Sequence, residues 1–147
     1  MSTPRITFAK AARDVYRAID ALDSSAVFEP RLRELVRIRA SQINGCAFCV
    51  DMHSVDAQRA GEDDRRIFAL AAWRESPFFD ARERAALELT EAMTRLSAHG
   101  VPDDVYAGAA EHFSEDELGN LMGVIIAINA WNRVGVATAL QPAAVAA

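Results

Sequence analysis

The decisive stretch is LVRIRASQINGCAFCVDMH, residues 35–53. Its first half continues a series of apolar residues at helical spacing, which predicts a helix that begins at Pro30, a residue that the first turn of a helix tolerates. Asn44-Gly45 then favours a turn. A second helix is predicted over residues 46–60. The stretch therefore predicts two helices joined by a reversal of the chain, with two cysteines at the start of the second.

Helical periodicity recurs along the rest of the chain, and no segment alternates between apolar and polar residues as a strand would. Asp80 with Glu83, and Ser114 with Glu117, have the spacing of capping boxes at helix starts. The further predicted helices cover residues 8–22, 64–72, 81–99, 105–113 and 115–140. Because we find no internal repeat and no linker, residues 1–147 predict one compact all-α domain of about six to seven helices, with 141–147 as a loose tail.

The composition limits the possible functions. The chain has 147 residues, of which 51% are hydrophobic and 25% charged, and its net charge is −5. Nucleic-acid binding needs a cationic surface, so we expect no nucleic-acid partner. The most apolar stretch, residues 118–140, contains Asn129, Asn132 and Arg133, which are costly in lipid, so we expect no membrane partner. The first ten residues lack the pattern of a secretory signal, and the sequence predicts a cytoplasmic protein.

The last predicted helix, over residues 115–140, is apolar on nearly every side. A helix of this kind must be covered all round, and the shorter helices offer limited surface for the purpose. We therefore expect it to contribute to the subunit interface of a homo-oligomer. The alternative, that it is the central pillar of a monomeric bundle, remains open from the sequence.

Reactive side chains are concentrated between Glu34 and His53, which bound the core motif of the chain. Cys46 and Cys49 are i,i+3 neighbours on the predicted helix, and Cys49 and His53 are i,i+4 neighbours. All three therefore lie on one helix face within about two turns. Glu34 lies on the preceding helix and can fold over this face because the chain reverses at Asn44-Gly45.

This pattern is suited to an activated dithiol. A thiolate is the reactive form of cysteine, and the amide groups at a helix N-terminus lower the pKa of thiols in the first turn. His53 can take the proton of Cys49 and stabilise the thiolate as an imidazolium. Glu34 can orient His53 or shuttle its proton. The second thiol, Cys46, can then close a disulfide after the attack.

Other interpretations of the same residues are open. The cysteines could be two small buried hydrophobic residues. Alternatively, Cys46, Cys49, His53 and Glu34 offer four metal ligands, although structural zinc prefers a second Cys or His pair, which is missing. The arginines at 31, 33, 37 and 39 are predicted to form a mostly solvated face, from which one could pair with Glu34. His99 and His112 lie near predicted helix ends and are expected to face solvent or to compensate a helix dipole instead of acting in catalysis.

Residues 35–53 resemble the core of the AhpD-like alkylhydroperoxidases, within the wider carboxymuconolactone decarboxylase family. Further similarity lies in residues 73–76, 82–87 and 128–133, so that the resemblance covers roughly residues 12–139. It implies a single compact all-α domain of the AhpD-like type that assembles as a homo-trimer or homo-hexamer. Phe48 departs from the pattern, since the best-known AhpD proteins carry a histidine immediately before the second cysteine.

The resemblance also implies a thiol-dependent peroxidase that works without cofactor, metal or haem. In such an enzyme Cys49 would attack the peroxide oxygen, and Cys46 would resolve the sulfenic acid into a disulfide. Glu34 and His53 match the residues that relay the proton. An external thiol or lipoyl-type reductant would return the disulfide to the dithiol.

The sequence thus predicts an enzyme that reduces hydroperoxides. One alternative is a disulfide reductase or thiol oxidoreductase with weak peroxide activity, which needs the same dithiol. Another is a carboxymuconolactone decarboxylase-like enzyme, which needs groups that bind carboxylates but no dithiol. A helical scaffold without catalytic activity is the last alternative, and for it the cysteines would be incidental.

Overall fold

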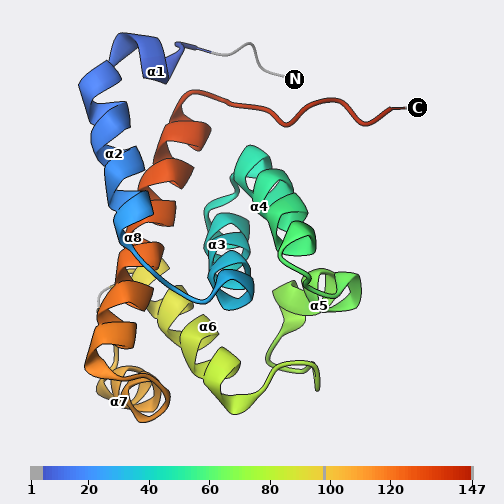
Figure 1. Cartoon of the computed structure of the whole chain (residues 1–147), viewed down its shortest axis with the longest axis vertical. Coiled ribbons are helices and arrows are strands. Elements are labelled where there is room, and N and C mark those ends of the chain that lie inside the picture. Colours follow the sequence, from blue (N-terminus) through green and yellow to red (C-terminus); the bar gives the residue numbers. More distant parts are fainter. Residues whose placement is uncertain (1–4, 98, 147) are drawn as a thin grey trace.

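The computed structural model describes residues 5–97 and 99–146. These residues form helices joined by loops and turns, and no strand is found among them (Figure 1). All-α architecture is therefore confirmed, with eight α-helices and one 3-10 turn among these residues. The elements are α1 (Phe8–Ala11), α2 (Arg13–Ser25), α3 (Pro30–Asn44), α4 (Ala47–Arg59), α5 (Asp64–Ala69), the 3-10 turn η1 (Leu70–Ala72), α6 (Ala81–Thr94), α7 (Asp103–His112) and α8 (Glu115–Ala137).

The predicted reversal between α3 and α4 is confirmed. Pro30 is the first residue of α3, and Gly45 ends this helix with a φ of 68°, a left-handed conformation that glycine adopts without a steric penalty. The prediction that Cys46 is the first helical residue is wrong by one position. Cys46 is the N-cap of α4 and has an extended backbone. Its side chain therefore takes the place of a capping group at the helix N-terminus.

The capping predictions are also confirmed. Asp80 with Glu83 starts α6, and Ser114 with Glu117 starts α8, each as a complete capping box with both hydrogen bonds present. Asp63 caps α5 through a hydrogen bond from the Arg65 N–H.

Three predicted helix boundaries are wrong, and one of them adds a helix to the predicted number. The helix expected over residues 8–22 is broken at Ala12, whose backbone is not helical, and so forms α1 and α2. The helix expected to reach residue 99 ends at Thr94, and the last helix ends at Ala137 instead of Leu140. Apolar periodicity marks the middle of a helix better than its ends, where a single non-helical residue decides.

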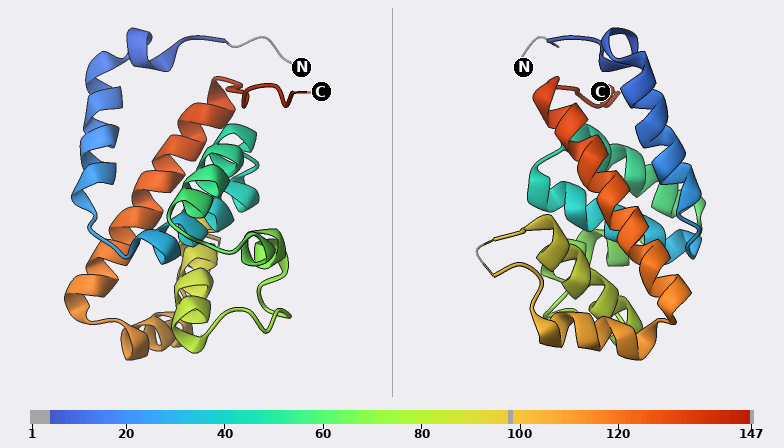
Figure 2. Two further views of the ribbon diagram at one scale, coloured as in Figure 1. Left: turned by 45° about the vertical axis from the view of Figure 1, so that its right-hand side comes forward. Right: turned by 90° about the vertical axis from the view of Figure 1, so that its left-hand side faces the viewer.

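Helices α3 and α8 occupy the centre of the molecule. α3 packs against α4, α6 and α8, and Leu35 and Val36 on it are completely buried. Full burial of such a side chain contributes about 2 kcal/mol, so α3 anchors the core. α8 runs beside α3, and α2 packs against another side of α8; α1 continues from the far end of α2, and α1 and α2 together form an arm (Figure 2).

The arm covers α8 only in part. No residue of α2 is buried, and Val15 on this helix is 54% exposed. On α8 itself Ile126 and Val136 are each 50% exposed. The apolar sides of these two helices are therefore not fully covered within one chain, and the predicted homo-oligomer stays a prediction.

Among the described residues, no helix has both the length and the apolar character needed to cross a membrane. Residues 141–146 form no helix and are mostly exposed, and Ala147 lies outside the described residues. The loose tail over residues 141–147 stays a prediction.

Candidate active site

Glu34 and His53 meet in the interior, between α3 and α4. His53 Nδ1 lies 2.9 Å from Glu34 Oε2, and both side chains are buried. An ionised carboxylate can only accept a hydrogen bond, so Nδ1 carries the proton and donates it to Glu34. The second ring nitrogen, Nε2, is then left in the form that accepts a proton. The predicted pairing of these residues across the chain reversal is thus present.

Arginine side chains keep Glu34 charged. Arg37 donates to Glu34 Oε1 at 2.7 Å, and Arg33 donates to the same oxygen at 3.2 Å. Burial alone would raise the pKa of Glu34, but the hydrogen bond with His53 and the charge of Arg37 outweigh it, and the pKa lies below its ordinary value. Glu34 is therefore a carboxylate at neutral pH, which suits orientation of His53 better than proton shuttling.

The prediction of a mostly solvated arginine face is wrong for two of its four residues. Arg37 is buried and bridges two carboxylates, since its second terminal nitrogen donates to Asp23 at 2.7 Å. Arg39 is largely buried too and donates to Glu91 at 2.9 Å. The residues face inward because α3 is packed on several sides, so that its polar positions also meet neighbouring helices.

Cys46 and Cys49 form a disulfide, with their Cα atoms 5.3 Å apart. Cys46 Sγ also accepts a hydrogen bond from the Cys49 N–H at 3.3 Å, at the N-terminus of α4. The cysteines are almost completely buried, with 2% and 3% exposure respectively. The two sulfurs are therefore within bonding reach, as the spacing predicted, and a positively polarised helix end faces Cys46.

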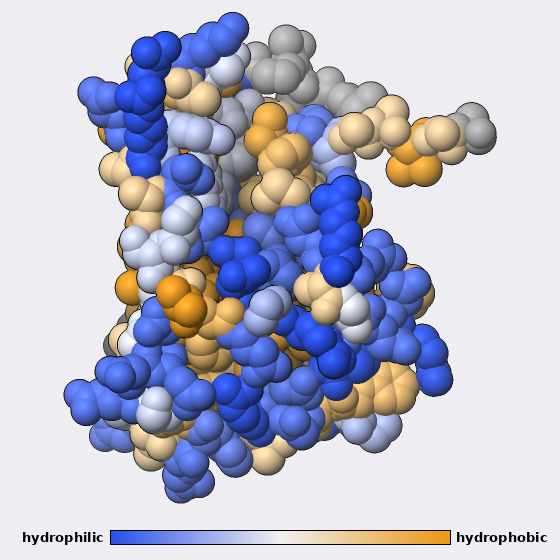
Figure 3. Space-filling view, viewed as in Figure 1, coloured by the Kyte–Doolittle hydropathy of each residue, from blue (hydrophilic) through white to orange (hydrophobic). Residues whose placement is uncertain are grey.

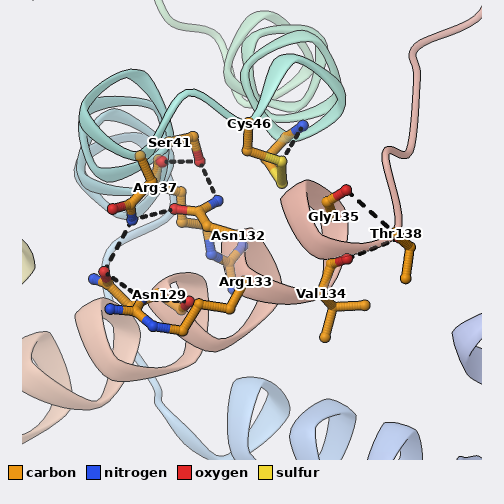
Figure 4. The surroundings of a disulfide bond; sticks show 11 residues. Arg37, Ser41, Cys46, Asn129, Asn132, Arg133, Val134, Gly135 and Thr138 are labelled. Carbon is orange, nitrogen blue, oxygen red and sulfur yellow. Dashed lines mark hydrogen bonds between the residues drawn. A yellow bond between two sulfur atoms is a disulfide. The ribbon is translucent and has the colours of Figure 1, made fainter. Parts of the chain in front are cut away.

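α8 covers the disulfide at Gly135, which lies beside Cys46 (Figure 4). A Cβ atom at this position would lie 2.8 Å from Cys46 Sγ and 3.5 Å from Cys49 Sγ, so only glycine fits without a shift. Close by, Asn132 donates to Ser41 Oγ at 2.9 Å and accepts from Asn44 at 2.9 Å, which ties α8 to α3. The sequence signal for this role was a glycine inside a helix, where it costs stability.

A cavity of about 580 Å³ opens beside the disulfide. Cys49 and His53 both line it, whereas Cys46 is not among its described lining residues. Most of the wall is apolar or aromatic and comes from the arm, α4 and α8; its aromatic members are Phe8, Tyr16, Phe48 and Trp131. The face drawn in Figure 3 is mostly hydrophilic, but hydrophobic residues gather where α4 begins and α8 ends.

One group of side chains could hold a cation. Ligand atoms of Glu34, His53 and Asp56 lie within 4.8 Å of one another, and Asp56 follows His53 by three residues on α4. Asp56 was not among the predicted ligands, although its i,i+3 spacing from His53 indicates that it lies on the same helix face. Arg33 and Arg37 already neutralise Glu34, which weakens the attraction of the group for a cation. The predicted alternative ligand set differs, because its cysteines are bonded to each other here.

His99 and His112 are exposed, as predicted. They belong to α7 and the loop before it, away from the α3–α4 pair that carries the candidate site.

The chain belongs to the carboxymuconolactone decarboxylase family, whose family model matches residues 10–92. The uncharacterized protein YdfG of Bacillus subtilis is 48% identical over 105 residues, which are 71% of each chain. A protein of unknown function from Agrobacterium tumefaciens, named as a candidate antioxidant defence protein AhpD, superposes with a TM-score of 0.93 at 38% identity. That match covers 97% of this chain and all of the other. The AhpD-like resemblance and fold type are thereby confirmed.

Fold similarity extends further than sequence similarity. The debrominase Bmp8 superposes with a TM-score of 0.78, over 92% of this chain and 74% of the other, at 22% identity. At this identity the match speaks for the fold alone, so the activity must be argued from the site.

Proposed function

We propose that this protein is a thiol-dependent peroxidase that reduces hydroperoxides through a dithiol/disulfide cycle of Cys49 and Cys46. The observation that carries the proposal is a disulfide whose Cys49 shares an apolar cavity with His53, while Glu34 fixes the orientation of that histidine. A thiol, a base and a group that orients the base are the parts that an activated nucleophile needs.

The oxidative half of the cycle starts from the reduced protein. His53 Nε2 takes the proton of the Cys49 thiol, and the thiolate attacks the terminal oxygen of the hydroperoxide. The O–O bond breaks, Cys49 becomes a sulfenic acid, and the alkoxide takes up a proton and leaves as an alcohol. The Cys46 thiol then attacks the sulfenic sulfur, which forms the disulfide and releases water. One dithiol and one hydroperoxide thus give one disulfide, one alcohol and one water.

The reductive half requires an external dithiol, or two thiols. One thiolate attacks the disulfide and forms a mixed disulfide, and the second thiol displaces the protein thiolate. The donor leaves as a disulfide, and Cys46 and Cys49 are both thiols again. A lipoyl-type carrier has the two neighbouring thiols that this step uses.

The alternatives fit the site less well. Cys46 and Cys49 are 3% exposed or less, which favours a small peroxide over the disulfide of a folded protein as oxidant. A decarboxylase for a carboxylated lactone needs cationic groups, and the described residues that line the cavity include neither Lys nor Arg. A scaffold would have no use for the Glu34–His53 pair beside the cysteines.

A stoichiometric reaction tests the proposal. We expect one equivalent of cumene hydroperoxide to remove both thiols of the reduced protein, with mass spectrometry locating an intramolecular Cys46–Cys49 bond. Cys49→Ser should abolish peroxide consumption, whereas Cys46→Ser should accumulate a sulfenic acid that dimedone traps. Normal turnover by Cys49→Ser, or two thiols that persist in the wild type, would reject the peroxidase function.

A further inference from the structure

The arm contributes one tyrosine and two aspartates to the cavity wall. Tyr16, Asp20 and Asp23 on α2 follow one another at i, i+4 and i+7, so they lie on one face of the helix, and all three line the cavity. Two carboxylates therefore border a space whose remaining wall is mostly apolar and aromatic.

The charge of one carboxylate is compensated and that of the other is not. Asp23 accepts from Arg37 at 2.7 Å, and the same guanidinium binds Glu34. Asp20 forms no ion pair or hydrogen bond with the part of the chain that the structure describes. Of the two carboxylates that line the cavity, Asp23 is thus neutralised by Arg37, and the exposed Asp20 is the one without a described ion-pair partner.

No lysine or arginine on the described wall offsets this charge, and the positive charge that His53 gains with the proton of Cys49 is balanced by the thiolate formed in the same step. The arginines that bind Glu34 and Asp23 lie behind the wall, since neither is among the described lining residues, and no lysine is either. A substrate carboxylate would therefore lose part of its hydration, gain no cationic partner and experience repulsion from Asp20.

Aromatic rings favour the opposite kind of ligand. Tyr16 and Trp131 pack edge to face, with ring centroids 5.0 Å apart, across the junction of α2 and α8. Rings that line a cavity pack well against flat apolar groups, and their faces attract cations. The wall therefore suits an uncharged or cationic aryl group.

We propose that the cavity selects uncharged and cationic aryl hydroperoxides over carboxylate-bearing ones, with Asp20 as the specificity-determining residue. The inference rests on the proposed function, because it concerns the substrate of the same cysteine. It adds the charge preference of that substrate and the residue on the arm that sets it.

Three probes of similar shape test this selectivity: cumene hydroperoxide, its 4-carboxylate and its 4-aminomethyl derivative, which is an ammonium ion at neutral pH. The measured quantity is the second-order rate constant for disulfide formation in the pre-reduced protein, so no reductant needs to be known. At low ionic strength we expect the carboxylate to react about fivefold more slowly than the neutral probe, and the ammonium probe at least as fast as the neutral one.

Two variants identify the residue responsible. Asp20→Asn should bring the ratio of the ammonium to the carboxylate rate close to one. Asp14→Asn changes the net charge equally and lies on the same helix, but Asp14 does not line the cavity, so it should keep the wild-type ratio. The ratio is insensitive to a general loss of active protein, because all three probes would be affected equally.

The failures can be told apart. If all three probes oxidise the dithiol at equal rates, or if Asp20→Asn keeps the wild-type ratio, the specificity proposal is overturned while the peroxidase function stands. If none of the probes oxidises the dithiol, the peroxidase function fails and the specificity proposal fails with it.

Discussion

At the scale of single residues, the chemistry of the site depends on one buried carboxylate. Glu34 accepts a hydrogen bond from the Nδ1–H of His53 and another from Arg37. Its pKa lies below the ordinary range, so it keeps its charge while the histidine accepts the proton of the attacking thiol. Replacing this carboxylate should therefore affect the rate through the orientation and tautomer of the imidazole.

We expect Glu34→Gln to slow peroxide-dependent disulfide formation by about 100-fold, within the range for general-base catalysis. Glu91→Gln is the matched control, because Glu91 is also buried, ion-paired and of lowered pKa, but binds Arg39 and Trp73 instead of His53. Both variants should lose stability in urea unfolding, and only Glu34→Gln should lose rate. Equal rate losses in the two would assign the effect to general destabilisation.

At the scale of elements, the contact between α8 and the disulfide limits which residue α8 can carry at the point of contact. Of its three glycines, at positions 119, 123 and 135, the first and the last are in very different surroundings. Nothing lies within 4 Å of a Cβ atom built at Gly119, whereas the same atom at Gly135 would meet both sulfurs. Gly119 is therefore dispensable, whereas Gly135 makes room for the redox pair.

We expect Gly135→Ala to destabilise the oxidised protein by about 1–3 kcal/mol, the usual cost of overpacking. Gly119→Ala should instead leave stability unchanged or raise it by up to about 1 kcal/mol, the difference in helix propensity. Denaturant unfolding of the two oxidised variants measures both effects. A Gly135→Ala protein as stable as the wild type would show that α8 moves away from Cys46 without cost.

At the scale of the whole molecule, the arm and α8 leave apolar surface in contact with water. Val15 on α2 and Ile126 and Val136 on α8 are at least half exposed. Burial of such side chains between subunits would remove this surface from water, which is the favourable contribution that drives association.

We expect the protein to assemble as a homo-trimer or homo-hexamer and Ile126→Glu to shift it toward the monomer, because the interface would then bury an unpaired charge. Size-exclusion chromatography with light scattering gives the mass of each species. Ala110→Glu, an added charge on the exposed side of α7, is the control. A wild type that elutes as a monomer would refute the assembly.

The sequence by itself determined the local features of this protein. Gly45 ends α3, two capping boxes start α6 and α8, and the spacing of Cys46, Cys49 and His53 puts them on one helix face, because each of these depends on residues only a few positions apart. For the same reason the pairing of Glu34 with His53 across a short reversal could be predicted.

The tertiary structure alone decided what surrounds the cysteines. Asp20, Arg37 and Gly135 come from α2, α3 and α8, and their contacts depend on how these helices pack. Periodicity describes which face of a helix is apolar, but not which neighbour meets it. The arginines of α3 were therefore expected mostly in solvent, with one of them able to pair with Glu34 as Arg37 does, and the glycine on α8 went unnoticed. Packing between distant segments therefore determined the shape and charge of the cavity, while local chemistry determined the dithiol.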